Sequence, residues 1–210
     1  MKTIIWDFNG TILDDVQYCI DIENQMSRDW NLKVPVIQKE VYLENFCFPV
    51  KNYYLKMGYD FVGYSYEELS HEFQLRFDQN FLQLGLCKGV KEALSHFKSL
   101  GYKQVILSAS QQEDLLKQVH LLGIEDYFEE IMGIQNNLAH SKVQRALDWM
   151  AQTKVNPEDC LYIGDTDHDA EVAMHMGIQE IVLIAQGHQS YEKLKKDFDK
   201  VYPSLLEIEF

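Results

Sequence analysis

Short apolar runs separated by amphipathic segments constrain the fold of this chain most. Four nearly continuous apolar runs lie at residues 3–8, 103–108, 160–164 and 180–185, and a weaker one lies at 128–133. Runs of this kind are typical of strands that are buried on both faces. Amphipathic segments separate them at residues 89–100, 110–122, 141–150 and 167–176. The alternation predicts an α/β fold with a doubly wound parallel sheet.

The segment after the first run breaks this alternation. It contains helical patterns at residues 16–30 and 36–46 and a third after the capping box Ser65-Tyr66-Glu67-Glu68, with no strong strand. We expect a smaller all-helical cap domain over residues 15–86, inserted after the first strand. Residues 1–14 and 87–210 would then form the α/β core. Such a cap would lie over the carboxyl ends of the strands, where α/β sheets bind ligands.

Charge and cysteine content limit the classes of partner. The formal net charge is −14, which argues against nucleic acid and against anionic membrane surfaces. No apolar stretch approaches the length of a membrane span, and the N-terminus does not have the pattern of a signal peptide. The four cysteines have neither zinc-ligand nor redox-motif spacing. We expect a reduced cytoplasmic protein, and the oligomeric state stays open.

Polar residues stand at the ends of the predicted strands. Asp7 ends the first, Ser108 and Ala109 follow the second, and Asp165 follows the third. Lys142 lies near the start of a predicted helix. These ends meet in one crevice of a doubly wound sheet. Carboxylates there could bind Mg²⁺, and a hydroxyl beside helix amides could hold phosphate.

Four motifs, in this order along the chain, carry a resemblance to a known family: Asp7-Phe8-Asn9-Gly10-Thr11, Ser108, Lys142, and Gly164-Asp165-Thr166-Asp167-His168-Asp169. The chain resembles phosphohydrolases of the haloacid dehalogenase superfamily, in the phosphoglycolate phosphatase-like subgroup with a helical C1-type cap. The resemblance implies a Mg²⁺-dependent hydrolase that acts on a small phosphorylated metabolite, such as phosphoglycolate or a sugar phosphate.

The resemblance also implies roles for individual residues. Asp7 would be the nucleophile and would form an aspartyl-phosphate. The Asp7 side chain, the Asn9 carbonyl and the Asp165 side chain would bind Mg²⁺, with Asp169 supporting the metal site. The phosphate would be held by Ser108, Ala109, Asn9, Gly10 and Lys142, and Lys142 would also neutralise charge during catalysis.

Asn9 departs from the family pattern. Phosphatases of the family usually have a second aspartate there, which protonates the leaving group and then activates water. An amide has no titratable proton near neutral pH. Two alternatives therefore stay open: a phosphate-binding regulatory protein that is slow or inactive, and a related hydrolase that cuts a carbon–halogen or carbon–phosphorus bond.

Several side chains outside the motifs have open or minor roles. Aromatic residues at 53–66 are expected to form the core of the cap or a lip that faces the substrate. Lys51, Lys56 and Arg76 are candidates to meet a charged leaving group. We expect Ser110 to cap a helix, through a capping box with Glu113. The histidines receive no role, and His168 is expected to be solvated.

Overall fold

The apolar runs form the strands of one parallel sheet. The protein was analysed as a computed structural model, which describes residues 2–136, 138 and 142–208. The sheet runs in the order β5-β4-β1-β6-β7-β8, and each neighbouring pair is parallel. Its strands are β1 (Thr3–Trp6), β4 (Lys103–Gln111), β5 (Glu130–Ile134), β6 (Cys160–Gly164), β7 (Glu180–Ile184) and β8 (Val201–Tyr202). The predicted α/β class and parallel sheet are confirmed, and β8 was not predicted.

Helices cover both faces of this sheet. Alternate side chains of β1 point to opposite faces, so that Trp6 and Ile5 belong to different apolar clusters. Helices α5 (Val90–Ser99) and α6 (Gln112–Leu121) pack on the Trp6 side, and α7 (Val143–Thr153) and α8 (Asp167–His175) pack on the Ile5 side. A short helix, α9 (Tyr191–Leu194), precedes β8.

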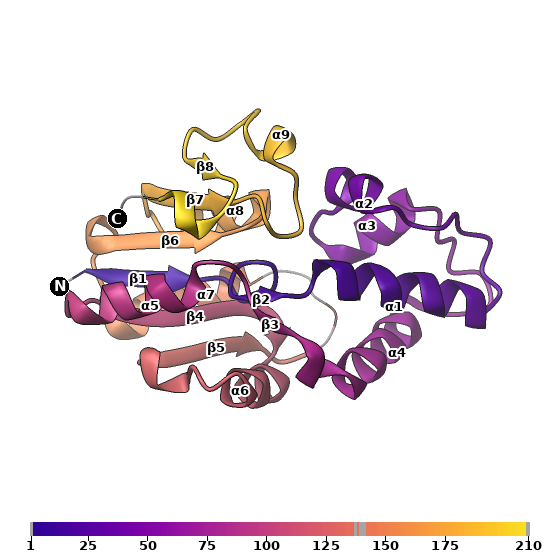
Figure 1. The fold of residues 1–210 in the computed structure, drawn as a ribbon, viewed down its shortest axis with the longest axis horizontal. Helices are drawn as coiled ribbons and strands as arrows, with labels where there is room; N and C mark the ends of the chain where they lie inside the picture. Colours follow the sequence, from indigo (N-terminus) through magenta and orange to yellow (C-terminus); the bar gives the residue numbers. More distant parts are fainter. Residues whose placement is uncertain (1, 137, 139–141, 209–210) are drawn as a thin grey trace.

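A helical insert lies beyond the carboxyl ends of the strands (Figure 1). It comprises α1 (Val16–Asp29), α2 (Lys39–Asn45), α3 (Val50–Lys56) and α4 (Tyr66–Gln79). An antiparallel pair of short strands, β2 (Leu13–Asp14) and β3 (Gly85–Leu86), joins it to the core. Ser65 begins α4 with the predicted capping box. The division into a core and a separate cap domain stays a prediction.

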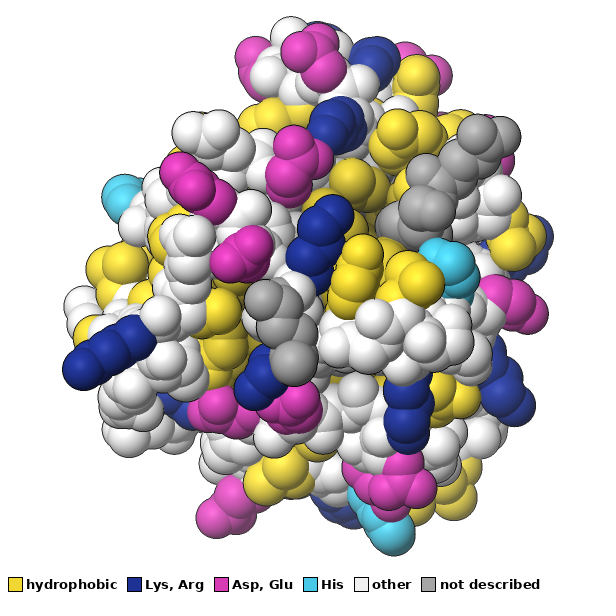
Figure 2. All heavy atoms as spheres, turned by 90° about the vertical axis from the view of Figure 1, so that its left-hand side faces the viewer, with side chains coloured by type: hydrophobic (Ala, Val, Ile, Leu, Met, Phe, Trp, Pro, Cys, Tyr) yellow, Lys and Arg dark blue, Asp and Glu magenta, His cyan; other side chains and the backbone are white. Residues whose placement is uncertain are grey.

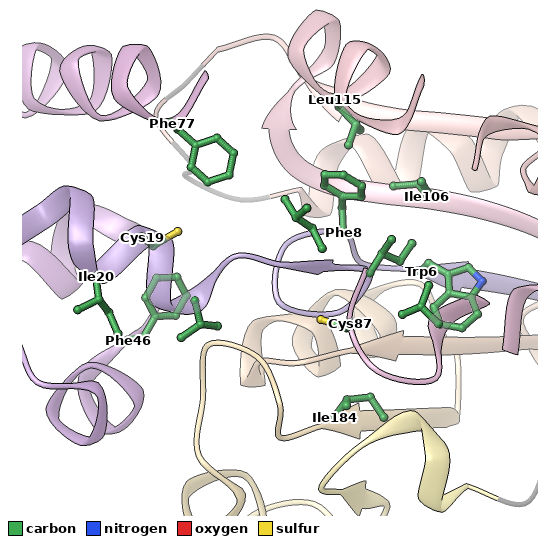
Figure 3. Packing of buried hydrophobic residues seen from close by; sticks show 14 of the residues in the cluster. Trp6, Phe8, Cys19, Ile20, Phe46, Phe77, Cys87, Ile106, Leu115 and Ile184 are labelled. Carbon is green, nitrogen blue, oxygen red and sulfur yellow. The ribbon is translucent and has the colours of Figure 1, made fainter. Parts of the chain in front are cut away.

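One apolar cluster continues from the core into the insert. Phe8, Ile106 and Leu115 come from the core, and Phe77 comes from α4 (Figure 3). Because burial of apolar surface is the main favourable term in folding, this shared cluster holds the insert against the sheet. The face at the opposite end of the core carries acidic and basic side chains mixed together (Figure 2). Among the described residues, no helix is long and apolar enough to cross a membrane.

Two helix starts differ from the prediction. Strand β4 continues through Ser110, and α6 is capped by Gln111, whose side chain accepts from the amides of Glu113 and Asp114. The predicted Ser110 capping box is therefore wrong, because a longer side chain one residue later satisfies the first amides. Helix α7 begins at Val143, and the predicted start at Ser141 lies outside the described residues.

Candidate active site

A buried lysine joins two carboxylates at the end of β1. Asp7 follows β1 and is 8% exposed, and Lys142 precedes α7 and is 2% exposed. Lys142 Nζ donates to Asp7 Oδ1, lies 2.6 Å from Asp169 Oδ1 and donates to the Leu107 carbonyl at 3.0 Å. Burial lowers the pKa of Lys142, but the Asp169 and Asp7 carboxylates outweigh it and raise that pKa well above its usual value. Lys142 is therefore a fixed positive charge beside Asp7.

Three carboxylates gather around this lysine. Oxygens of Asp7, Asp165 and Asp169 all lie within 4.8 Å of one another. Asp165 accepts hydrogen bonds from Thr11 Oγ1 at 3.1 Å and from the His188 amide at 2.6 Å. The cluster joins the ends of β1 and β6, which are neighbours in the sheet.

Asp169 is held by the first turn of α8. Its Oδ2 accepts hydrogen bonds from the Thr166 hydroxyl at 2.7 Å and from the Thr166 amide at 3.0 Å. Thr166 and Asp169 together form the capping box at the start of α8. His168 in the same turn is buried and stacks on Phe48, with ring centroids 4.6 Å apart. The expectation that His168 is solvated is therefore wrong, because the insert covers the start of α8.

The buried carboxylates of Asp7, Asp15, Asp165 and Asp169 outnumber the positive groups beside them, Lys142 and His188. Burial and the Asp169 carboxylate raise the pKa of Asp7 to about 6, against the opposing effect of Lys142. Burial raises the pKa of Asp165 well above its usual range, and the Asp7 and Asp169 charges add to the rise while His188 opposes it. A hard divalent cation takes carboxylate oxygens as ligands. The donor set therefore fits a Mg²⁺ ion chemically.

Glycine is required at position 10. Gly10 has a φ of +72°, which is a left-handed conformation. A Cβ there would collide with Asp165 Oδ2 and with the His188 ring. The turn after β1 therefore comes close enough to Asp165 only because residue 10 has no side chain.

The Asn9 side chain is engaged at both ends. Its Nδ2 donates to Asp15 Oδ2 at 2.7 Å, and its Oδ1 accepts from the Ser110 hydroxyl at 2.7 Å. Asp15 is 1% exposed and also accepts from the Gly10 amide at 2.9 Å. Asp15 was not predicted as a site residue, because it precedes α1 and could be taken for an ordinary helix cap.

A histidine that the sequence analysis left without a role lies at the same site. The ring of His188 places Nε2 3.3 Å from Asp15 Oδ1 and Nδ1 2.9 Å from the Tyr42 hydroxyl. Burial lowers the pKa of His188, but the Asp15, Asp165 and Asp7 carboxylates raise it to about 9. His188 follows β7 at the carboxyl edge of the sheet, and that position was a signal that sequence reasoning could have used.

Most of the predicted site residues line one cavity of about 160 Å³. The Ser108 hydroxyl accepts from the Ser110 amide at 3.0 Å. Asp167 is exposed and does not line the cavity. The predicted residues on the wall are Asp7, Asn9, Ser108, Ala109, Lys142, Asp165 and Asp169.

The helical insert forms the rest of the cavity wall. Tyr54 and Tyr66 line the cavity, whereas Tyr53 and Tyr59 are buried in the insert without lining it. The aromatic segment therefore contributes both to the core of the insert and to the cavity wall. The three basic residues that were candidates to meet a charged leaving group do not line the cavity. Lys51 is exposed beside the ring of Phe61, and Lys56 donates to Cys47 Sγ. Arg76 pairs with Asp29 and Glu72.

Comparisons with known proteins agree with this architecture. A family model described as haloacid dehalogenase-like hydrolase matches residues 4–183. A phosphoglycolate phosphatase of Vibrio vulnificus is 24% identical over an alignment of 184 positions, which covers 84% of this chain and 81% of that protein. Tyrosine-protein kinase PtkA of Mycobacterium tuberculosis is 22% identical over 87% of this chain, but the match spans only 62% of that protein. A haloacid dehalogenase-like hydrolase from Streptococcus pneumoniae has a TM-score of 0.77 at 19% identity, over 99% of this chain and 96% of that one.

Proposed function

The chain belongs to the haloacid dehalogenase-like hydrolases, and we propose that it is a Mg²⁺-dependent phosphohydrolase that forms an aspartyl-phosphate at Asp7. The observation that carries the proposal is the pairing of Asp7 with Lys142 on the wall of a cavity that Ser108 and Ala109 also line. The Vibrio relative, named a phosphoglycolate phosphatase, supports a small phosphomonoester as the substrate class.

Asp7 would act as the nucleophile. A carboxylate oxygen attacks phosphorus, the ester P–O bond breaks, and the leaving alkoxide takes the bonding electrons and receives a proton from water to become the alcohol. Water then attacks the phosphorus of the aspartyl-phosphate, which releases phosphate and restores the Asp7 carboxylate. Lys142 holds one Asp7 oxygen in place and offsets negative charge as the phosphate approaches.

The remaining residues would bind the phosphate and the metal. The Ser108 hydroxyl and the Ala109 amide are suited to hold phosphoryl oxygens, beside Gly10 and Asn9. Mg²⁺ would be held by the Asp7 and Asp165 side chains and the Asn9 carbonyl, with Asp169 in support. When bound, Mg²⁺ supplies further positive charge beside the buried carboxylates and polarises a phosphoryl oxygen.

A slow enzyme or a silent phosphate-binding protein is the second candidate. One amide hydrogen of Asn9 is used by Asp15, and its carbonyl oxygen is used by Ser110. Asn9 is therefore a fixed part of the site and does not supply an acid or base. An enzyme that cuts a carbon–phosphorus bond would need a cap lysine in the substrate cavity. Lys142 is the only lysine among the described lining residues, and it is paired with Asp7 and Asp169, which disfavours this alternative.

Phosphate release from a generic aryl phosphate tests the proposal. Wild type should release phosphate only with Mg²⁺, and Asp7→Asn should abolish release while the circular dichroism spectrum is kept. Exposed Asp21→Asn on α1 is the matched control for the substitution itself. Release by Asp7→Asn near the wild-type rate would show that another residue attacks phosphorus.

A further inference from the structure

A buried carboxyl group lines the cavity inside the helical insert. Glu23 lies two turns into α1, about 10 Å along the helix axis from its first residue, and α1 leads away from the sheet (Figure 1). It is 3% exposed, and the Tyr53 hydroxyl donates to its Oε2 at 2.9 Å. Among the described residues, no hydrogen bond reaches its Oε1. Glu23 thus presents a carboxyl oxygen to a molecule in the cavity that Asp7 also lines.

The share of the cavity wall that the insert contributes is rich in aromatic rings and has no basic side chain among the described lining residues. Among the described lining residues, the only basic side chains are Lys142, which contacts Asp7 and Asp169, and His188, whose ring contacts Asp15. Aromatic rings make up most of the insert's share of the wall, namely Tyr42, Phe46, Phe48, Tyr54, Tyr66, Phe73 and Phe77. Rings of this kind attract a cation through the negative charge of their faces.

A carboxyl group in such a place is costly to ionise without a partner. Burial raises the pKa of Glu23 to about 8, although the Tyr53 hydrogen bond and the His188 charge oppose the rise. An ammonium group would supply an opposite charge that the insert's share of the wall lacks. A ligand carboxylate would instead lie against an acidic side chain, and the nearest charge of opposite sign, His188, is already paired with Asp15.

We propose that Glu23 and the rings around it select a compact phosphomonoester whose alcohol carries an ammonium group. The proposal rests on the proposed function, because it assumes that the phosphate lies at Asp7. The cavity volume of about 160 Å³ is below the range of pockets for drug-sized ligands, and therefore limits the alcohol to a few heavy atoms. The substrate would thus differ from phosphoglycolate, whose alcohol carries a carboxylate.

Three phosphomonoesters of matched length separate the alternatives: 2-aminoethyl phosphate, 2-hydroxyethyl phosphate and phosphoglycolate. Their affinities would be measured by titration calorimetry with Mg²⁺ in the Asp7→Asn background, where turnover is blocked. We expect the amine to bind about tenfold or more tightly than the hydroxyl compound, and phosphoglycolate to bind most weakly. Glu23→Gln keeps an acceptor for Tyr53 and should reduce the preference for the amine to about twofold or less. Exposed Glu67→Gln should keep the preference.

Amine binding should also release a proton from Glu23. The titratable groups that face Glu23 are Cys19, Tyr42, Tyr53, Tyr54, Tyr59 and His188. Glu23 is mostly protonated near pH 7, and an ammonium group would favour its ionised form. The binding enthalpy of the amine should therefore vary with the ionisation enthalpy of the buffer, and Glu23→Gln should remove that variation.

The outcomes distinguish this proposal from the proposed function. Equal affinities for the three compounds, tighter binding of phosphoglycolate, or an amine preference that survives Glu23→Gln would each overturn the role of Glu23. Those results would leave phosphatase activity untouched. Conversely, an amine preference without phosphate release by wild type would uphold Glu23 as a recognition group and would refute the hydrolase.

Discussion

At position 9 an amide occupies the place where a second aspartate is usual in the family. Asn9 bridges two side chains, donating to Asp15 and accepting from Ser110. A carboxylate at position 9 could still accept a hydrogen bond from Ser110. It could not donate to Asp15, however, and would place a second negative charge at hydrogen-bonding distance from that carboxylate. The pair Asn9 and Asp15 thus keeps one carboxylate where two would repel each other.

Asn9→Asp should raise turnover of an alkyl phosphomonoester by about tenfold or more, because a positioned acid or base contributes roughly 10²–10⁴-fold. Repulsion by Asp15 would raise the pKa of the new carboxyl group and favour its role as an acid. Steady-state phosphate release is the measurement. The double variant Asn9→Asp with Asp15→Asn removes that repulsion and serves as the matched comparison.

Deamidation must be controlled in this experiment, since Asn9 precedes Gly10 and could convert to aspartate on storage. Peptide mass spectrometry of each sample shows whether conversion has occurred. Unchanged turnover of Asn9→Asp, in samples free of deamidation, would show that position 9 does not carry the missing acid or base.

The stability of the protein should depend on pH through Glu23. Its pKa is raised from an ordinary 4.5 to about 8 in the folded state, so the folded state binds more protons between these values. The stabilisation is full below about pH 4.5 and is lost as pH rises through about 8. At about 1.4 kcal/mol per pKa unit, the upper bound of the effect is about 5 kcal/mol.

Urea unfolding of wild type and Glu23→Gln at about pH 6 and pH 9 measures this dependence. Between these pH values the free energy of unfolding of wild type should fall by up to about 3 kcal/mol relative to Glu23→Gln. Glu67→Gln, which is exposed on α4, should follow wild type. A constant difference between wild type and Glu23→Gln would mean that Glu23 has no raised pKa.

At the scale of elements, the turn after β1 positions the site. Gly10→Ala would force a methyl group against Asp165, and we expect Mg²⁺ affinity to fall by about tenfold or more, as for other changes beside metal ligands. Gly63→Ala is the control, because Gly63 also has a positive φ, +84°, with nothing within 4 Å of its Cβ position. Titration calorimetry with Mg²⁺ compares the two. Equal affinities in both variants would show that the contact with Asp165 does not matter.

The sequence predicted the elements whose signals are local. Continuous apolar runs located β1, β4, β6 and β7, because strands buried on both faces need apolar residues at every position. The two-residue strands β2, β3 and β8 are too short to leave such a pattern. The Ser110 cap was wrong because Gln111, with a longer side chain, could reach the same amides.

The site residues too were predicted where their signal is local and missed where it is not. Asp7, Ser108, Lys142 and Asp165 were predicted from their places at element ends, and the structure brings them to one cavity. His188 was missed because its contacts with Asp15 and Tyr42 join residues far apart in the chain, and no local pattern reports them. Glu23 was missed because an acidic residue on an amphipathic helix is usually solvated.

At the scale of the whole molecule, the helical insert is docked over the strand ends. The Tyr42 hydroxyl meets His188, and Gln189 Nε2 and Lys193 Nζ both donate to the Phe46 carbonyl. These contacts and the shared apolar cluster hold the insert over the strand ends, where caps in other enzymes open and close around the substrate. We propose that residues 15–86 move as one cap domain over residues 1–14 and 87–210.

The most direct test of the account is detection of phosphate on Asp7. Because Asn9 does not assist the attack of water, breakdown of the aspartyl-phosphate should be the slow step, and the intermediate should accumulate. Wild type mixed with Mg²⁺ and an aryl phosphate should release a burst of alcohol close to the enzyme concentration, and peptide mass spectrometry of the quenched sample should find phosphate on Asp7. Asp7→Asn should show neither. Steady phosphate release with Asp7 unmodified, or a burst that survives Asp7→Asn, would contradict the account.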